Sequence, residues 1–203
     1  MKEEKIVRSP AIYKILKPPA VFLFRLFFRT KISGKENIPK KGAVVLAGNH
    51  IKFWDCFMVM AGTNRAVHFL AKSELFGNFF TKWFFNAAGL IPVHRNRKDH
   101  NALASAERYL EEGSVIGVFP EGTTRKGGKK LLPFKMGAVK MASDTNTPIV
   151  PFTIKGKYGF LGTKAEIIFH KPIYIKGDDL ESENEHFREF IKSNLKDAGE
   201  ENE

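Results

Sequence analysis

The chain has 203 residues, which is long enough for one domain with a substantial hydrophobic core and short for two. Its single cysteine excludes an internal disulfide and is compatible with a reducing compartment. The formal net charge of +11 is unevenly distributed, since residues 1–176 carry +18 and residues 177–203 carry −7, so the positive body should attract phosphate groups, anionic bilayers or nucleic acid.

The N-terminal segment has the composition of helices that lie at a membrane surface. Residues 11–17 are amphipathic, Pro18 and Pro19 interrupt the pattern, and residues 20–29 resume as an apolar, aromatic run flanked by cations. This run is far shorter than the roughly 20 apolar residues that span a bilayer, and it lacks the cleavage site of a signal peptide. We therefore expect a pair of interfacial membrane-contact helices over residues 1–30, with packing of the aromatics on the protein's own core as the alternative.

A histidine and a carboxylate follow the first buried strand. Residues 43–48 form an apolar run that predicts this strand, and His50 follows it at the rim of a sheet, where open α/β proteins place ligands. Asp55 begins a helix-like segment at 55–61 and could be its N-cap. The short turn between them could fold the Asp55 carboxylate back onto one imidazole nitrogen and leave the other nitrogen as a general base. Alternatively, His50 is a polar rim residue and Asp55 only a helix cap.

A second buried strand, at 115–119, runs directly into Pro120-Glu121-Gly122-Thr123-Thr124-Arg125. A glycine-containing turn with an arginine is suited to holding an anion, because the guanidinium offers a planar fork of donors and the turn can add backbone N–H groups. Three lysines and two glycines follow within five residues. The loop could be a solvated lysine loop, but together with His50 and Asp55 it predicts a base beside a phosphate clamp.

Strand-like and helix-like runs alternate along the chain, which predicts a single-domain α/β sandwich around a largely parallel central sheet. The strand-like runs lie near 43–48, 66–70, 90–94, 115–119, 148–154 and 166–175. The helix-like runs lie near 55–61, 77–88, 99–112, 135–145 and 183–197. An aromatic patch at 79–85 could border a membrane or an acyl-chain tunnel, or could be core. The acidic C-terminal end is expected to fray.

The motif His50-x-x-x-x-Asp55 followed by Phe119-Pro120-Glu121-Gly122-Thr123-Thr124-Arg125 resembles the glycerolipid acyltransferase family, most closely the bacterial 1-acylglycerol-3-phosphate acyltransferases of the PlsC type. Two further family blocks have counterparts, at residues 89–95 and 149–152. The four blocks occur in the family's order and together are highly specific, although His-x-x-x-x-Asp alone arises often by chance. One departure is Lys52, where the family commonly has a serine that is not the nucleophile of the usual mechanism.

The resemblance implies that an acyl chain passes from a thioester of acyl carrier protein or coenzyme A to the free hydroxyl of lysophosphatidate (1-acylglycerol-3-phosphate), giving phosphatidate. His50 would remove the hydroxyl proton and Asp55 would orient the ring, with no acyl-enzyme, metal or cofactor. Residues 31–203 would be the acyltransferase domain. The substrate-binding residues would be Arg125, which is the first choice for the acceptor's phosphate, then Lys72 and Arg95, with Glu121, Gly122 and Thr123 shaping the acceptor pocket.

Several alternatives remain at this point. The acceptor could be glycerol-3-phosphate or another lysolipid, or the chain could be a non-catalytic basic protein that binds lipid headgroups; a protein that only binds would not need His50 as a base. Cys56 could form an acyl-enzyme, but the neighbouring carboxylate should raise the pKa of its thiol. No nucleic-acid-binding motif is present, so we expect an anionic membrane surface as partner and a peripheral location at the cytoplasmic face of the cell membrane.

Overall fold

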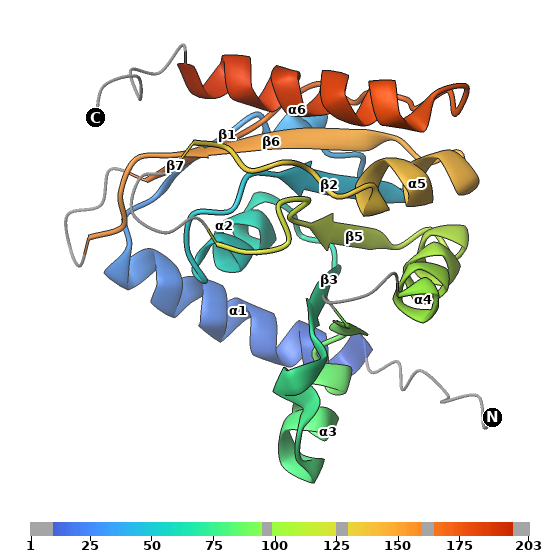
Figure 1. Ribbon diagram of the computed structural model, residues 1–203. Helices are drawn as coiled ribbons and strands as arrows, with labels where there is room; N and C mark the ends of the chain where they lie inside the picture. The colour runs from blue at the N-terminus through green and yellow to red at the C-terminus, as the bar shows by residue number, and fades with distance from the viewer. Residues whose placement is uncertain (1–9, 95–98, 125–129, 160–164, 197–203) are drawn as a thin grey trace.

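The computed structural model describes residues 10–94, 99–124, 130–159 and 165–196. One seven-stranded sheet runs through the molecule in the order β1-β7-β6-β2-β5-β3-β4 (Figure 1). The strands are β1 (Lys31–Ser33), β2 (Val44–Gly48), β3 (Val67–Lys72), β4 (Ile91–Val93), β5 (Val115–Val118), β6 (Ile149–Lys155) and β7 (Glu166–Phe169). All pairings are parallel except that of β6 with β7. The predicted α/β class and largely parallel sheet are confirmed.

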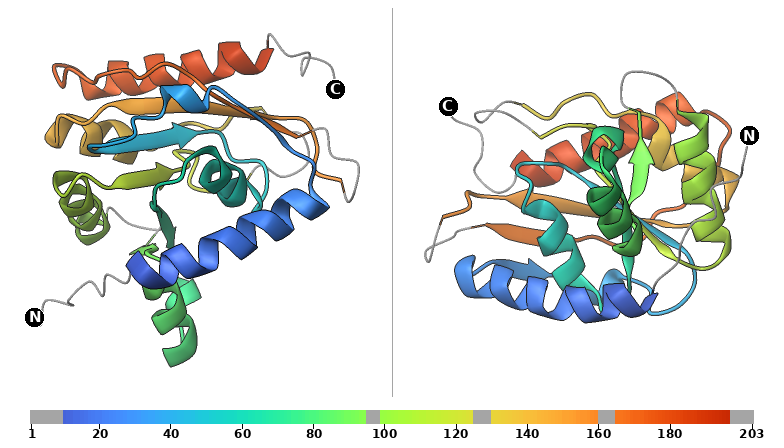
Figure 2. Two further views of the ribbon diagram at one scale, coloured as in Figure 1. Left: turned by 180° about the vertical axis from the view of Figure 1, so that it is seen from behind. Right: turned by 90° about the horizontal axis from the view of Figure 1, so that it is seen from below.

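Helices cover both faces of this sheet (Figures 1 and 2). They are α1 (Pro10–Phe27), α2 (Asp55–Gly62), α3 (Phe79–Ala87), α4 (His100–Glu111), α5 (Gly137–Asp144) and α6 (Leu180–Lys196), with short 3-10 helices η1 (Lys35–Asn37) and η2 (Ser73–Phe76). The side chains of β2 alternate between two cores: Val44 and Leu46 pack with α1 and α2, whereas Val45 and Ala47 pack with α4, α5 and α6. All of β2 is buried, as expected for a strand covered on both faces.

The sheet register places the two sequence motifs at the same edge. β2 is a central strand that pairs with β5 on one side and β6 on the other. In the β2–β5 pair, Ala47 lies opposite Val118, so the chain leaves both strands at the same level. His50 and Glu121 each come three residues after these paired positions, and therefore emerge side by side at the carboxyl edge of the sheet.

The N-terminal segment differs from the predicted pair of helices. Residues Pro10–Phe27 form one continuous helix, with Pro18 and Pro19 inside it. The helix contacts the body on both sides of the prolines. Before them, the Tyr13 hydroxyl accepts a hydrogen bond from Val67 N at 3.0 Å, and after them Phe24 is buried. Packing of this kind stabilises a helix that has lost two backbone donors. The predicted interruption was therefore wrong, and residues 1–9 lie outside the described residues.

One predicted strand is much shorter than expected, and one strand was not predicted. The run at 166–175 is a strand only over Glu166–Phe169, followed by a single bridge between Ile149 and Ile173. Pro172 has no N–H and cannot continue the ladder. β1 was not predicted, because only three residues pair and they lack a clear apolar alternation. The acidic residues 200–203 lie outside the described part of the chain.

Candidate active site

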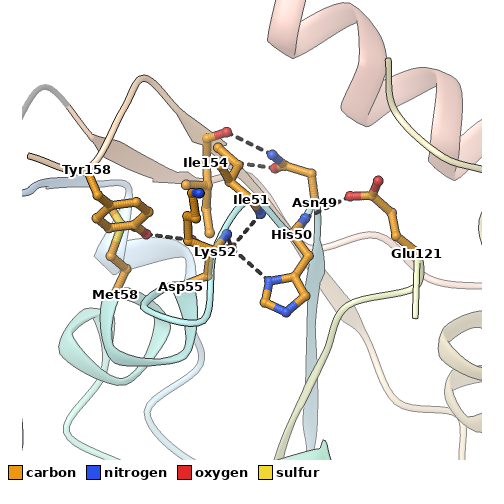
Figure 3. Close-up of polar contacts among 9 residues, drawn as sticks. All are labelled: Asn49, His50, Ile51, Lys52, Asp55, Met58, Glu121, Ile154 and Tyr158. Carbon is orange, nitrogen blue, oxygen red and sulfur yellow. Dashed lines mark hydrogen bonds and ion pairs between the residues drawn. The ribbon is translucent and has the colours of Figure 1, made fainter. Parts of the chain in front are cut away.

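His50 and Asp55 form a hydrogen-bonded dyad at the carboxyl end of β2. His50 Nδ1 lies 2.8 Å from Asp55 Oδ2, as predicted (Figure 3). An ionised carboxylate can only accept hydrogen bonds, so Nδ1 carries the proton of the ring and Nε2 keeps its lone pair. Nε2 points away from Asp55 and has no hydrogen-bond partner within the described residues. The imidazole stacks on Phe119 with ring centroids 3.9 Å apart and is 12 % exposed, so it has a fixed orientation and some access to a substrate.

The Asp55 carboxylate is fully buried and fixed by four donors. Its Oδ2 atom accepts from His50 Nδ1 and from the backbone N–H groups of Ile51 at 2.6 Å and Lys52 at 2.9 Å. Its Oδ1 atom accepts from the Tyr158 hydroxyl at 2.5 Å. The spacing of the motif follows from these bonds, since the intervening turn must curl around the carboxylate to bring both amides and the ring to it.

These bonds also correct the expectation that Asp55 caps α2. The residue before the helix is Trp54, whose side chain makes no capping hydrogen bond. The Asp55 carboxylate points back to the preceding turn instead of forward to the first amides of α2. A dyad and an N-cap compete for the same oxygens, and here the dyad takes them.

Glu121 braces the backbone of the dyad. Its carboxylate is buried, with Oε1 accepting from His50 N at 2.8 Å and Oε2 accepting from Leu132 N at 3.0 Å. It therefore ties the end of β2 to both sides of the basic loop at 125–129. Both oxygens thus accept from backbone N–H groups, and the place of Glu121 in the acceptor pocket stays a prediction.

Gly48 and Asn49 fix the end of β2 against β6, and sequence reasoning gave them no role. Asn49 is fully buried, donates from Nδ2 to Ile154 O at 2.8 Å and accepts at Oδ1 from Ile154 N at 2.7 Å. A Cβ atom on Gly48 would lie 2.0 Å from Phe152 O. This close approach requires glycine two residues before His50.

Three of the other predicted binding residues lie in the described part of the chain. Gly122 has a φ of +69°, and a Cβ there would lie 2.9 Å from Lys135 Cε, so glycine suits this turn. Thr123 is exposed. Lys72, at the end of β3, is half-exposed, and its Nζ lies 3.6 Å from Glu74 Oε1. The remaining candidates, Arg95 and Arg125, lie outside the described residues.

The thiol next to the dyad has the wrong chemistry for a nucleophile. Burial, followed by the charge of Asp55, raises the pKa of Cys56 to about 12. A thiol with this pKa is protonated at neutral pH, whereas a nucleophilic cysteine needs its thiolate. Among the residues that the structure describes, no group of three or more His, Cys, Asp or Glu side chains is placed to hold a metal ion.

Several known proteins are similar to this chain in sequence. They include 1-acyl-sn-glycerol-3-phosphate acyltransferases of Borreliella burgdorferi, 37% identical over 133 residues (64% of this chain, 52% of that protein), and of Bacillus subtilis, 28% identical over 168 residues (80% and 83%). The chloroplastic 1-acyl-sn-glycerol-3-phosphate acyltransferase BAT2 of Brassica napus is 31% identical over 166 residues (76% and 48%). The chain thus spans about half the length of the first two of the curated relatives that it matches.

The fold is also similar to that of a known acyltransferase. The crystal structure of the 1-acyl-sn-glycerophosphate acyltransferase PlsC from Thermotoga maritima superposes with a TM-score of 0.72 at 25% identity, covering 92% of this chain and 78% of that one. The family model described as Acyltransferase matches residues 29–155, a range that contains His50, Asp55 and Glu121 together with the central strands that position them. The chain therefore belongs to the acyltransferase family.

Proposed function

We propose that this protein transfers an acyl chain from an acyl thioester to the free hydroxyl of lysophosphatidate, giving phosphatidate. The observation that carries this proposal is the dyad, in which a buried carboxylate holds His50 with its Nε2 lone pair pointing away from Asp55. A protein that only bound lipid headgroups would gain nothing from a buried carboxylate aimed at an imidazole. The relatives from Borreliella burgdorferi and Bacillus subtilis are named 1-acyl-sn-glycerol-3-phosphate acyltransferases, which supports the same acceptor.

The proposed reaction is a single displacement. His50 Nε2 removes the proton of the acceptor hydroxyl as that oxygen attacks the thioester carbonyl. Asp55 stabilises the imidazolium that forms, without itself taking the proton. The tetrahedral intermediate then collapses, the C–S bond breaks, and the leaving thiolate takes the proton back from His50. The acyl group never resides on the protein, in agreement with the protonated state of the Cys56 thiol. The thioester carrier is acyl carrier protein or coenzyme A.

We propose that the acceptor's phosphate binds at the basic loop that follows β5, at residues 125–129. Glu121 precedes this loop and accepts from Leu132 N, which follows it, and from His50 N, so the chain enters and leaves the loop beside the dyad. Arg125 would bind the phosphate through its planar guanidinium, with Lys72 and Arg95 as further cations. Glu121, Gly122 and Thr123 would shape the acceptor pocket.

We further propose that residues 1–30 contact an anionic membrane surface from its cytoplasmic side, next to the acyltransferase domain at 31–203. The outer face of α1 exposes large apolar side chains, including Phe22 (66 %), Leu23 and Leu26. α3 projects from the body beside α1 (Figures 1 and 2). It exposes four more large apolar side chains, Phe79, Phe80, Trp83 and Phe84. In the part of the chain that the structure describes, no helix is both long and apolar enough to cross a bilayer.

Replacing His50 by alanine should lower the rate of phosphatidate formation about 10³-fold, because general-base catalysis is lost while the acceptor site is unchanged. The measurement is acyl transfer from a labelled thioester to lysophosphatidate in mixed micelles. His186→Ala, which changes an exposed histidine of α6, is the matched control and should retain wild-type activity. Activity that survives in His50→Ala would move the chemistry to another residue.

Replacing Arg125 by alanine should raise KM for lysophosphatidate at least tenfold, because a charge-assisted contact with the phosphate is lost. Transfer to a monoacylglycerol, which has no phosphate, should change little. The control is Lys130→Ala, which removes an exposed cation at the end of the same loop. Equal impairment with both acceptors would show that Arg125 does not bind the phosphate.

The double variant Phe22→Asp and Leu26→Asp should bind vesicles of anionic phospholipid at least tenfold more weakly in co-sedimentation. Each change removes an apolar side chain that is worth about 1.5–3 kcal/mol when fully buried, and adds a negative charge. Tyr174→Asp, at a position that is 67 % exposed, controls for charge alone. Unchanged binding by the double variant would contradict contact through this face of α1.

A further inference from the structure

Tyr158 reaches the dyad from the far side of Asp55. It follows β6 in the chain, and its hydroxyl donates to Asp55 Oδ1 at 2.5 Å and lies 2.7 Å from Met58 Sδ (Figure 3). The two oxygens of Asp55 are thus divided, since His50 and the two backbone amides bond to Oδ2, whereas Oδ1 is held by Tyr158. The position of Oδ1 sets the rotation of the carboxylate plane, and with it the aim of Oδ2 at the imidazole.

The chemistry of the site makes this hydroxyl a donor. Asp55 is fully buried, so a carboxylate oxygen without a donor would be costly there. Burial, and then the negative charge of Asp55, raise the pKa of Tyr158 far above its ordinary value. The hydroxyl therefore stays protonated. The titratable groups that face it are Asp55 and, more weakly, Cys56.

The ring of Tyr158 is held by Phe24 of α1 and by Phe28, the residue directly after α1. Phe28 packs edge-on against it, with centroids 5.8 Å apart and ring planes at 88°, and Phe24 lies at 6.5 Å and 62°. Phe24 is itself buried and stacks on Phe57 of α2 at 5.8 Å. Edge-to-face pairs of this kind fix the position of a ring as well as burying it.

We propose that Tyr158 is a positioning residue that acts on His50 through Asp55, and that the packing of α1 holds Tyr158 in place. This inference rests on the proposed general-base role of His50. Its chemical content is a chain of contacts from α1 through Tyr158 and Asp55 to the reacting nitrogen. The helix assigned to membrane contact thereby also supports the base.

The hydroxyl should affect the pH dependence of the reaction as well as its rate. The positive end of the O–H dipole points at Asp55 and therefore disfavours a positive charge on the adjacent imidazole. Without the hydroxyl, protonation of His50 becomes easier, so the acidic limb of the kcat/KM profile should move to higher pH. A residue that only supported the fold would lower the amount of active protein without moving that limb.

The test is Tyr158→Phe, which keeps the ring and removes only the hydroxyl. We expect kcat to fall about tenfold, KM for lysophosphatidate to stay unchanged, and the acidic limb to move up by about half a pH unit. Tyr174→Phe removes an exposed hydroxyl outside the site and should match the wild type. Circular dichroism melting of each variant separates folding from catalysis.

A second variant tests the packing at the end of α1. Phe28→Ala keeps the Tyr158 hydroxyl but removes the ring, directly after α1, that packs on it, and should shift the acidic limb in the same direction by a smaller amount. A wild-type profile for Phe28→Ala alone would overturn the part assigned to this packing.

The outcomes separate this inference from the proposed function. A Tyr158→Phe enzyme with wild-type kcat and pH profile, alongside an inactive His50→Ala, would overturn the role of Tyr158 and leave the general base intact. A lower kcat with an unmoved acidic limb would also overturn it, because the hydroxyl would then be structural only. Full activity in His50→Ala would instead contradict the proposed function, because His50 would then not be the base.

Discussion

The hydrogen bond from His50 Nδ1 to Asp55 Oδ2 is the contact around which the rest of the site is arranged. A buried carboxylate is costly unless donors surround it, and the turn between the two residues supplies backbone amides from Ile51 and Lys52. Glu121 holds the backbone of His50 from the other side, at 2.8 Å. Each of these contacts restricts the imidazole, so that its second nitrogen faces the site with its lone pair available.

The parallel sheet brings these groups together from distant parts of the sequence. His50 follows β2 and Glu121 follows β5, and the paired register of the two strands delivers both residues to one edge of the sheet. β6, on the other side of β2, leads to Tyr158, which contacts Asp55. The site therefore draws on three neighbouring strands, while α1 and α2 close the face of the sheet beneath it. One side of α1 makes apolar contacts with the body, and the opposite side of the same helix is exposed.

Much of this arrangement could be predicted from the sequence, and the rest depended on tertiary contacts. The buried strands and the contact between His50 and Asp55 followed from apolar runs and from a short turn. The continuity of α1 did not, because local rules place a break at two prolines and the packing on both sides is non-local. Nor did the role of Tyr158, which lies 103 residues from Asp55 and whose neighbours show no recognisable motif. Stacking of Phe119 on His50 likewise depends on the register of two strands.

The proposed chemistry depends on Asp55 fixing the tautomer of His50 with the proton on Nδ1. Nitrogen-15 NMR of histidine-labelled protein at pH 8 measures this directly, with the His50 signals assigned by their loss in His50→Gln. We expect a protonated Nδ1 and an unprotonated Nε2 for this ring in the resting protein. A His50 ring with its proton on Nε2 would rule out the proposed general base, because the nitrogen facing the substrate could then not accept a proton.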